Sequence, residues 1–347
     1  MNILITNIVL IVVEGIILCN SWIKQGKNIF LILAFIQLLV LHSFLDPFSM
    51  EDLPGYYDTF NEFGKNSLFY SIVIGYVGVK MEPGWIVLCK CLYFISTNFR
   101  ILLIIDSILI IGGYLVMIKK YSPIFYVSVF VFLCTTFNQS LFVLRQHTAM
   151  AICLFSIPYI IKRDIKKFLV IITTAFLIHQ TAIIFIPVYF VYNIRFSKKN
   201  WVIFLILLFL GNVVASRIFN WAFSHLWYNS YEDRDASNLT VFFIQLCGIL
   251  LYLVSIRFKT LKIKSIEKVF LSMACLGLLL SFIGVGFSPT NRLVKYFSIS
   301  DIWLIPFALK KYKTKGIILG IFVLVMYFLL FLAPSTTDYI KNYRLIF

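Results

Sequence analysis

The sequence predicts an all-α polytopic membrane protein, and three observations lead to this fold class. Of its 347 residues, 61% are hydrophobic and only 13% are charged, whereas about half of a soluble domain is apolar. Apolar runs recur from end to end and approach the roughly 20 residues that a transmembrane helix needs. The runs lack the alternation of barrel strands, and a bilayer otherwise admits only helices. We therefore expect one integral membrane domain over residues 1–347.

The charge of the chain supports this prediction and sets the topology. The net charge is +16, but the basic residues lie in short loops between apolar runs, which is typical of the positive-inside rule and argues against a nucleic-acid partner. Six basic clusters are expected in the cytoplasm, and they contain only two acids, Asp164 and Glu267. The clusters are Lys24/Lys27, Lys119/Lys120, Lys162–Lys167, Arg195–Lys199, Arg257–Lys268 and Lys310–Lys315.

These clusters divide the chain into about ten full spans. The first run follows Met1 without a basic segment before it, so we interpret it as a retained helix rather than a cleaved signal peptide. Both termini are then expected on the external side of a bacterial cytoplasmic (inner) membrane. The predicted spans are 3–22, 28–45, 99–118, 122–141, 143–161, 200–217, 239–256, 268–287, 292–309 and 316–333.

Two apolar stretches do not fit as simple spans. Residues 84–97 are too short to cross, and a crossing there would place Lys119 and Lys120 outside, so we expect an interfacial or re-entrant helix. Residues 168–194 have basic clusters at both ends and must cross an even number of times. We therefore expect a hairpin of two short helices that breaks near "IHQTA" at 178–182. Irregular backbone at that depth is tolerated where it lines a cavity.

Two long acidic and aromatic loops are expected outside, over residues 46–83 and 218–238. Their Tyr, Trp, Asn and Asp side chains suit sugar binding, because rings stack on sugars and amides or carboxylates bond hydroxyls. The same residues also suit the aromatic belt of a membrane interface. The seven cysteines all lie in apolar segments without metal-ligand spacing, and we interpret them as packing residues.

Four ionisable residues are expected at one level near the external surface, and intramembrane charge is a functional indicator. Arginine offers a planar fork that matches phosphate, and fixed positive charge stabilises a departing pyrophosphate. A carboxylate or an imidazole could take a proton from an attacking hydroxyl. Each residue also has a purely structural alternative. The arginines could contact lipid headgroups or pair with carboxylates, the histidine could cap a helix break, and the glutamate could be an ordinary loop acid. The four residues are Glu82, Arg145, His179 and Arg292.

At these positions the sequence resembles the EpsG family of exopolysaccharide-biosynthesis membrane proteins, which belong with the Wzy-type O-antigen polymerases. The resemblance runs over about residues 45–310 as ordered motifs. His147 stands where the family more often has a small residue, and the first-loop motif does not rank Asp52 against Asp58. The motifs are "GYYDTFNEF", "EPGWIVLCKCL", "LRQHTAMAICLF", "FLIHQTAIIFIPVYF" and "NRLVKYFSISDIWLIP".

The resemblance implies a metal-independent glycosyltransferase with a GT-C-like helical architecture and no cofactor. It would transfer a growing glycan from undecaprenyl pyrophosphate onto a repeat unit carried by the same lipid, with a chain-length regulator as a further partner. Glu82 or His179 would be the base, and Arg145 and Arg292 would bind the pyrophosphate. The supporting or substrate-binding residues would be Gln146, Tyr296, Tyr57 and Asp58.

Three other functions remain open at this stage. A ligase or a single-sugar transferase would share the lipid-phosphosugar chemistry. A flippase or transporter would bring inverted repeats and a charged path at mid-membrane, and Asp106 and Asp301, inside predicted spans, could serve a proton relay in such a protein. A membrane acyltransferase would want its histidine toward the cytosol, whereas His179 is expected outside.

Overall fold

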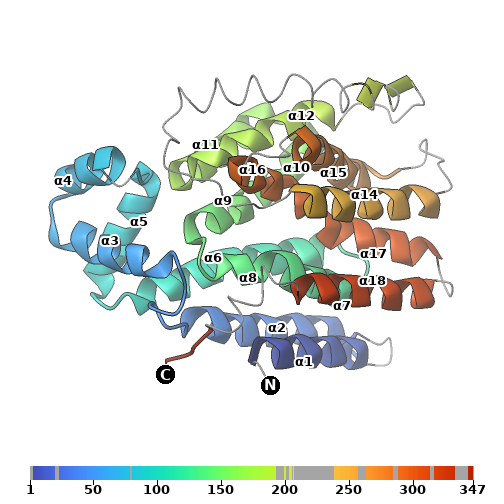
Figure 1. The fold of residues 1–347 in the computed structure, drawn as a ribbon, viewed down its shortest axis with the longest axis horizontal. Coiled ribbons are helices and arrows are strands. Elements are labelled where there is room, and N and C mark those ends of the chain that lie inside the picture. The colour runs from blue at the N-terminus through green and yellow to red at the C-terminus, as the bar shows by residue number, and fades with distance from the viewer. Residues whose placement is uncertain are drawn as a thin grey trace. The chain divides into compact units, whose positions relative to one another are not determined.

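The computed structural model divides into two compact units, whose helices are labelled in Figure 1. The first comprises Met1–Pro158, Lys166–Ile183 and Ile317–Phe347, and the second comprises Tyr159–Ile165 and Ile184–Gly316. Regular structure in the described ranges is helical, apart from a β-bridge between Leu45 and Leu345. The structure describes residues 3–19, 23–78, 80–192, 199–200, 203–204, 206, 238–256, 263–283, 288–312, 316–332 and 343–346.

The first unit is built around α6 (Arg100–Tyr121), which packs against α2 (Gly26–Ser43) and α9 (Leu144–Leu154). Small residues allow the close approaches. A methyl group added at Gly113 of α6 would lie 3.2 Å from Ala151 Cβ of α9, as expected where membrane helices pack through small side chains. Other helices of this unit are α1 (Ile3–Leu18), α7 (Phe125–Phe132), η2 (Leu133–Phe137), α8 (Asn138–Ser140) and α18 (Gly316–Phe331).

The expected external loop 46–83 is itself largely helical, with α3 (Leu53–Lys65), α4 (Leu68–Val73) and the π-helical turn η1 (Ile74–Gly78). It leads into α5 (Pro83–Ile95), which occupies the stretch predicted as a short helix at 84–97. Lys90 of α5 donates to the carbonyls of Phe63 and Gly64 at the end of α3, at 3.2 and 3.3 Å. This ammonium satisfies helix-terminal acceptors and fixes α3 on α5.

The stretch 168–194 contains a break at the position expected from the sequence. Helix α11 (Ile165–Ile178) ends before His179, and the 3-10 helix η3 (Gln180–Phe185) and α12 (Ile186–Val191) follow. The His179 N–H still bonds back to Ala175 O at 2.9 Å, so His179 closes the last turn of α11. The membrane depth of this segment and of α5 stays a prediction.

The second unit is centred on α14 (Asn238–Ser255), α15 (Ser265–Ile283), α16 (Ser288–Ser298) and α17 (Asp301–Tyr312). Phe270 of α15 stacks on Trp303 of α17, with ring centroids 4.6 Å apart. Near the ends of these helices, Lys311 Nζ lies 2.5 Å from Glu267 Oε2. The Tyr252 hydroxyl donates to the same oxygen, so three helices share one buried carboxylate.

Three helices in the described ranges are long and apolar enough to cross a membrane, namely Gly26–Ser43, Arg100–Tyr121 and Ser265–Phe282. The helical membrane class is thus supported, while the count of ten spans stays a prediction. The predicted continuous helix 143–161 is instead two helices, α9 and α10 (Ile157–Lys162). Pro158 explains the interruption, because proline removes a helical donor and excludes the preceding turn.

The predicted span 292–309 also differs from the structure, which has α16 starting a turn earlier and ending at Ser298 before α17 begins at Asp301. The second predicted external loop, 218–238, lies outside the described residues except for Asn238, which begins α14. The predicted span 200–217 likewise falls almost entirely outside them.

Candidate functional site

Glu82 stands at the centre of a polar cluster in the first unit. It is the N-cap residue of α5 in extended conformation, φ −72° and ψ 145°, and its side chain makes no capping bond to its own helix. Pro83 at the first helical position needs no such bond and presets the backbone for the helix. The carboxylate is therefore available to neighbouring elements, and its side chain is only 7% exposed.

Gly84 brings the start of α5 against the end of α11. A Cβ placed at Gly84 would lie 2.6 Å from the carbonyl oxygen of Leu177 and 2.8 Å from its carbon. Only a residue without a side chain fits this approach. Because Leu177 precedes His179 by two residues, Gly84 allows the imidazole to reach Glu82.

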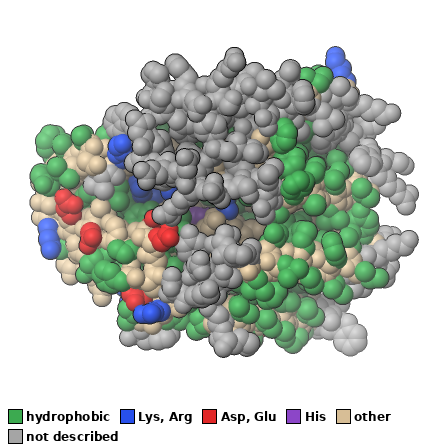
Figure 2. Space-filling view, viewed as in Figure 1, with side chains coloured by type: hydrophobic (Ala, Val, Ile, Leu, Met, Phe, Trp, Pro, Cys, Tyr) green, Lys and Arg blue, Asp and Glu red, His purple; other side chains and the backbone are tan. Residues whose placement is uncertain are grey.

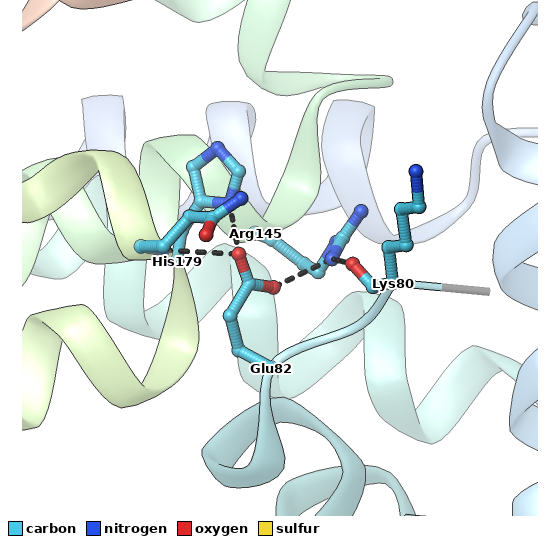
Figure 3. A network of polar contacts seen from close by, with 5 residues as sticks. Lys80, Glu82, Arg145 and His179 are labelled. Atoms are coloured by element: carbon cyan, nitrogen blue, oxygen red, sulfur yellow. Dashed lines mark hydrogen bonds and ion pairs between the residues drawn. The ribbon is translucent and has the colours of Figure 1, made fainter. Parts of the chain in front are cut away.

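Arg145 enters the cluster from a third element, the first turn of α9. Its Nη1 donates to Glu82 Oε2 at 2.6 Å and lies 3.4 Å from the carbonyl oxygen of Lys80. Lys80 adopts φ 55°, a left-handed conformation that is uncommon for a residue with a side chain. Both bonds use Nη1, and the rest of the guanidinium is directed away from Glu82 (Figure 3).

One carboxylate thus joins three segments that are far apart in the sequence (Figure 3). Glu82 Oε1 accepts from His179 Nδ1 at 2.8 Å and from the Gln180 backbone N–H at 3.0 Å, while Oε2 accepts from Arg145. Gln180 begins η3, so the anion also lies at a helix N-terminus, where negative charge is stabilised. The His179 side chain is 6% exposed and that of Arg145 18%.

The electrostatics of the cluster keep Glu82 ionised. Burial would raise its pKa, but the hydrogen bond and charge of His179, the charge of Arg145 and the Gln180 N–H outweigh burial and lower the pKa to about 2. A group with such a low pKa is a poor proton acceptor near neutral pH. The imidazole, held through Nδ1 with Nε2 on the opposite side of the ring, is the better base (Figure 3).

Tyr56 of α3 is a member of the cluster that the sequence reading missed. The Arg145 guanidinium carbon lies 5.8 Å from the centre of the Tyr56 ring, within cation–π range. The inward face of α3 is Leu53, Tyr56, Phe60 and Phe63, a helical spacing that is visible in the sequence. That spacing would have selected Tyr56 over its neighbour Tyr57.

A second buried polar contact anchors the helix that carries Arg145. The Thr148 hydroxyl, one turn after Arg145, donates to Asp106 Oδ1 of α6, and both residues are fully buried. Asp106 Oδ2 has no hydrogen-bond partner among the described residues. The bond fixes the rotation of α9, and hence the direction of Arg145, against α6.

The other predicted site residues are distributed differently. Gln146 is buried beside Arg145, with Nε2 3.9 Å from Met150 Sδ. Tyr57 packs on Phe48 and Phe99, and Asp58 is exposed on the outer face of α3. No hydrogen bond, ion pair or ring contact links Tyr57 or Asp58 to Glu82, Arg145 or His179 among the described residues, and their substrate-binding role stays a prediction.

Arg292 and Tyr296 lie one turn apart on α16 of the second unit, and Tyr296 is fully buried. Whether Arg292 joins the cluster of Glu82, Arg145 and His179 stays a prediction. Among the described residues there is no group of three or more His, Cys, Asp or Glu that could hold a metal ion.

Comparison with known proteins decides the family of the chain. A family model described as the EpsG family matches residues 27–345, nearly the whole chain. The chain belongs to the EpsG family. EpsG is a Wzy-type polymerase family, so the resemblance inferred from the motifs is confirmed. Comparisons with curated proteins and with solved structures gave no match.

Membership of the EpsG family connects this membrane protein with polysaccharide polymerisation in general. Each residue of the cluster lies within the matched range, and four of the EpsG-like motifs contribute a member to it. "GYYD" holds Tyr56, "EPGW" begins with Glu82, "LRQH" holds Arg145 and "IHQT" holds His179. The last three motifs are the segments that the Glu82 carboxylate joins.

Proposed function

We propose that this EpsG-family protein is a polysaccharide polymerase that uses undecaprenyl-pyrophosphate-linked glycans as donor and acceptor at the external face of the membrane. The observation that carries the proposal is the buried Glu82 carboxylate, bonded at once to His179 and Arg145. An imidazole oriented by a carboxylate is an arrangement for proton transfer. An adjacent arginine suits a pyrophosphate leaving group.

In the proposed reaction the acceptor sugar hydroxyl gives its proton to His179 Nε2, and its oxygen forms a bond to the anomeric carbon of the donor glycan. The bond from that carbon to the pyrophosphate oxygen breaks, and undecaprenyl pyrophosphate leaves with the electron pair. Arg145 stabilises the negative charge that develops on it. Glu82 holds the imidazole through Nδ1, stabilises its charged form and directs the guanidinium.

Arg292 is proposed as a second contact to the pyrophosphate, with Tyr296 and Gln146 in support. Asp58 and Tyr57, near the acidic face of α3, are proposed for the acceptor sugar. These assignments rest on residue chemistry and on the EpsG motifs. The site would need no metal, because the fixed charge of the guanidinium groups would neutralise the negative charge that develops on the pyrophosphate.

Reconstitution tests the proposal. The full-length protein in vesicles, given only lipid-pyrophosphate-linked repeat units, should produce a ladder of lengthening glycans and release lipid pyrophosphate. A single transfer that stops after one addition would indicate a ligase, and transport without new glycosidic bonds would indicate a flippase. Either outcome would overturn the proposed polymerase.

A pair of arginine variants tests the assigned role of Arg145. Arg145→Lys should slow ladder formation by about 100-fold, since a lysine cannot make the forked contact. Arg163→Lys is the matched control. The Arg163 Nη1 group also donates to a backbone carbonyl, that of Tyr189, at 2.6 Å, and its guanidinium also lies over a tyrosine ring. Equal activity in the two variants would remove Arg145 from the mechanism.

A further inference from the structure

The segment Leu68–Gly78, in which η1 continues directly from α4, presents large apolar side chains outward. Phe69 is 80% exposed and Val77 67%, while Tyr76 and Val73 are nearly half exposed. Phe69, Val73 and Val77 are spaced by four residues, so they form one stripe along the helix. Figure 2 shows hydrophobic side chains gathered over α4 at the left edge of the view, beside acidic side chains over α3.

The inward face of the same helix is made of small residues. Ser71 is buried, and its hydroxyl donates to Phe63 O of α3 at 3.1 Å. Gly75 is also buried, and a Cβ there would lie 2.6 Å from Ile86 Cδ1 of α5. A helix in water turns its large apolar residues toward the protein. This helix does the reverse, as helices that face lipid do.

The ends of the segment are polar. Ser67 caps the first turn by accepting from the Tyr70 N–H at 3.3 Å, and the exposed residues Lys65 and Lys80 flank the segment. Eleven helical residues extend only about 16 Å, roughly half the thickness of the hydrocarbon core. The segment is therefore too short to cross a bilayer, but its length and exposed face suit a helix lying in the interface.

We propose that Leu68–Gly78 is embedded in the outer leaflet, with Phe69, Val73 and Val77 among the acyl chains and Tyr70 and Tyr76 at headgroup level. The occupant of this exposed face is thus the lipid bilayer. The neighbouring helix α3 supports this assignment, because its outer face carries the exposed acidic residue Asp58, which suits water and not lipid. The stretch 46–83 is then partly an aqueous loop and partly a membrane-embedded helix. We call this helix, Leu68–Gly78, the wedge.

The wedge ends at the polar cluster. The Met81 N–H bonds to Gly75 O at 2.7 Å, which folds the chain back directly before Glu82. Lys80, two residues after the wedge, offers its carbonyl to Arg145. A lipid-facing surface thus adjoins the cluster. If the proposed function is correct, the tail of a lipid-linked substrate would lie on this surface while its pyrophosphate reaches Arg145. This part of the inference rests on the proposed function.

Depth-dependent fluorescence quenching tests the wedge. Single cysteines at Phe69, Val73 or Val77 would carry an environment-sensitive fluorophore in the full chain, with the exposed Cys91 and Cys247 replaced by serine. The protein would be placed in vesicles of phosphatidylethanolamine and phosphatidylglycerol. Gly55→Cys on α3 is the matched control, because Gly55 is exposed and nothing lies within 4 Å of its added Cβ.

Labels at the three wedge positions should be quenched by nitroxide-bearing acyl chains and shielded from iodide, whereas the Gly55 label should show the opposite. Iodide quenching of all four labels would overturn the proposal, since the wedge would then lie in water. Protection from both quenchers would overturn it in favour of a covering protein. The fluorescence measurement does not depend on catalytic turnover. The failure of this proposal can therefore be distinguished from the failure of the proposed polymerase function.

Discussion

Gly84→Ala is the change that most directly perturbs the geometry of the cluster without touching its charges. The added methyl group would lie 2.6 Å from Leu177 O, and ordinary contact begins at 3.4 Å, so the end of α11 must retreat by about 0.8 Å. A retreat of that size would stretch the 2.8 Å bond between His179 and Glu82 to roughly 3.6 Å, beyond the range of a hydrogen bond.

The expected cost has two parts. Forcing a methyl group into a packed contact destabilises a protein by about 1–3 kcal/mol, and misplacing a catalytic group by about 1 Å can slow a reaction about 100-fold. We expect Gly84→Ala to lower the melting temperature modestly and to slow glycan ladder formation by about 100-fold. The loss of rate should exceed what the loss of folded protein explains.

Both effects can be measured on purified protein, as thermal unfolding and as the initial rate of polymer formation per folded molecule. Gly55→Ala should change neither, because its Cβ meets open space. Gly15→Ala should destabilise without slowing the folded enzyme, because its Cβ meets Tyr126 in the α1–α7 contact. Wild-type rate in Gly84→Ala would refute the argument that this approach positions His179.

Three further predictions concern protonation, the Tyr56 ring and the anchor of α9. Because the folded pKa of Glu82 is about 2, below its ordinary value of 4.5, its stabilisation is complete above about pH 4.5 and is lost as the pH falls toward 2. The loss, on the order of 3 kcal/mol, should appear in acid melting curves of the wild type and be absent from Glu82→Gln; parallel curves would contradict it. Tyr56→Phe should keep most activity, whereas Tyr56→Leu removes a cation–π contact of about 1 kcal/mol and should slow polymerisation severalfold; equal rates would contradict a role for the ring. Thr148→Val should lower the unfolding free energy by about 1–3 kcal/mol, because it deprives the buried Asp106 of a hydrogen-bond partner. Thr148→Ser keeps the hydroxyl and should not lower it. An unchanged melting temperature in both variants would show that this bond is unimportant.

Much of the helical organisation follows from the sequence because lipid enforces simple rules. Apolar runs and basic loops predicted the helical membrane class and the break at His179. Interruptions within helices were harder to predict, since hydropathy does not distinguish a continuous span from two helices joined by a turn. Pro158 was the available signal for the break between α9 and α10.

The candidate site was predictable in its residue types but not in its contacts. Glu82, Arg145 and His179 stood out as ionisable groups in apolar surroundings, yet only tertiary packing reveals that one carboxylate bonds both partners. The chemistry of Tyr57 and Asp58 predicts a binding role for them, while the helical period of α3 turns Tyr56 inward instead. The proposal of His179 rather than Glu82 as the base depends on the electrostatics of the folded protein, which lower the pKa of Glu82 to about 2.

The most direct test of the central claim compares His179→Gln with His42→Gln in reconstituted protein. A glutamine amide at 179 can still donate to Glu82 but cannot take up a proton. His42 is also buried and hydrogen-bonded, to Ser140 O and Ser107, but it lies outside the cluster. We predict that polymerisation falls by about 100-fold or more in His179→Gln alone. Equal rates in the two variants would contradict the assignment of His179 as the base.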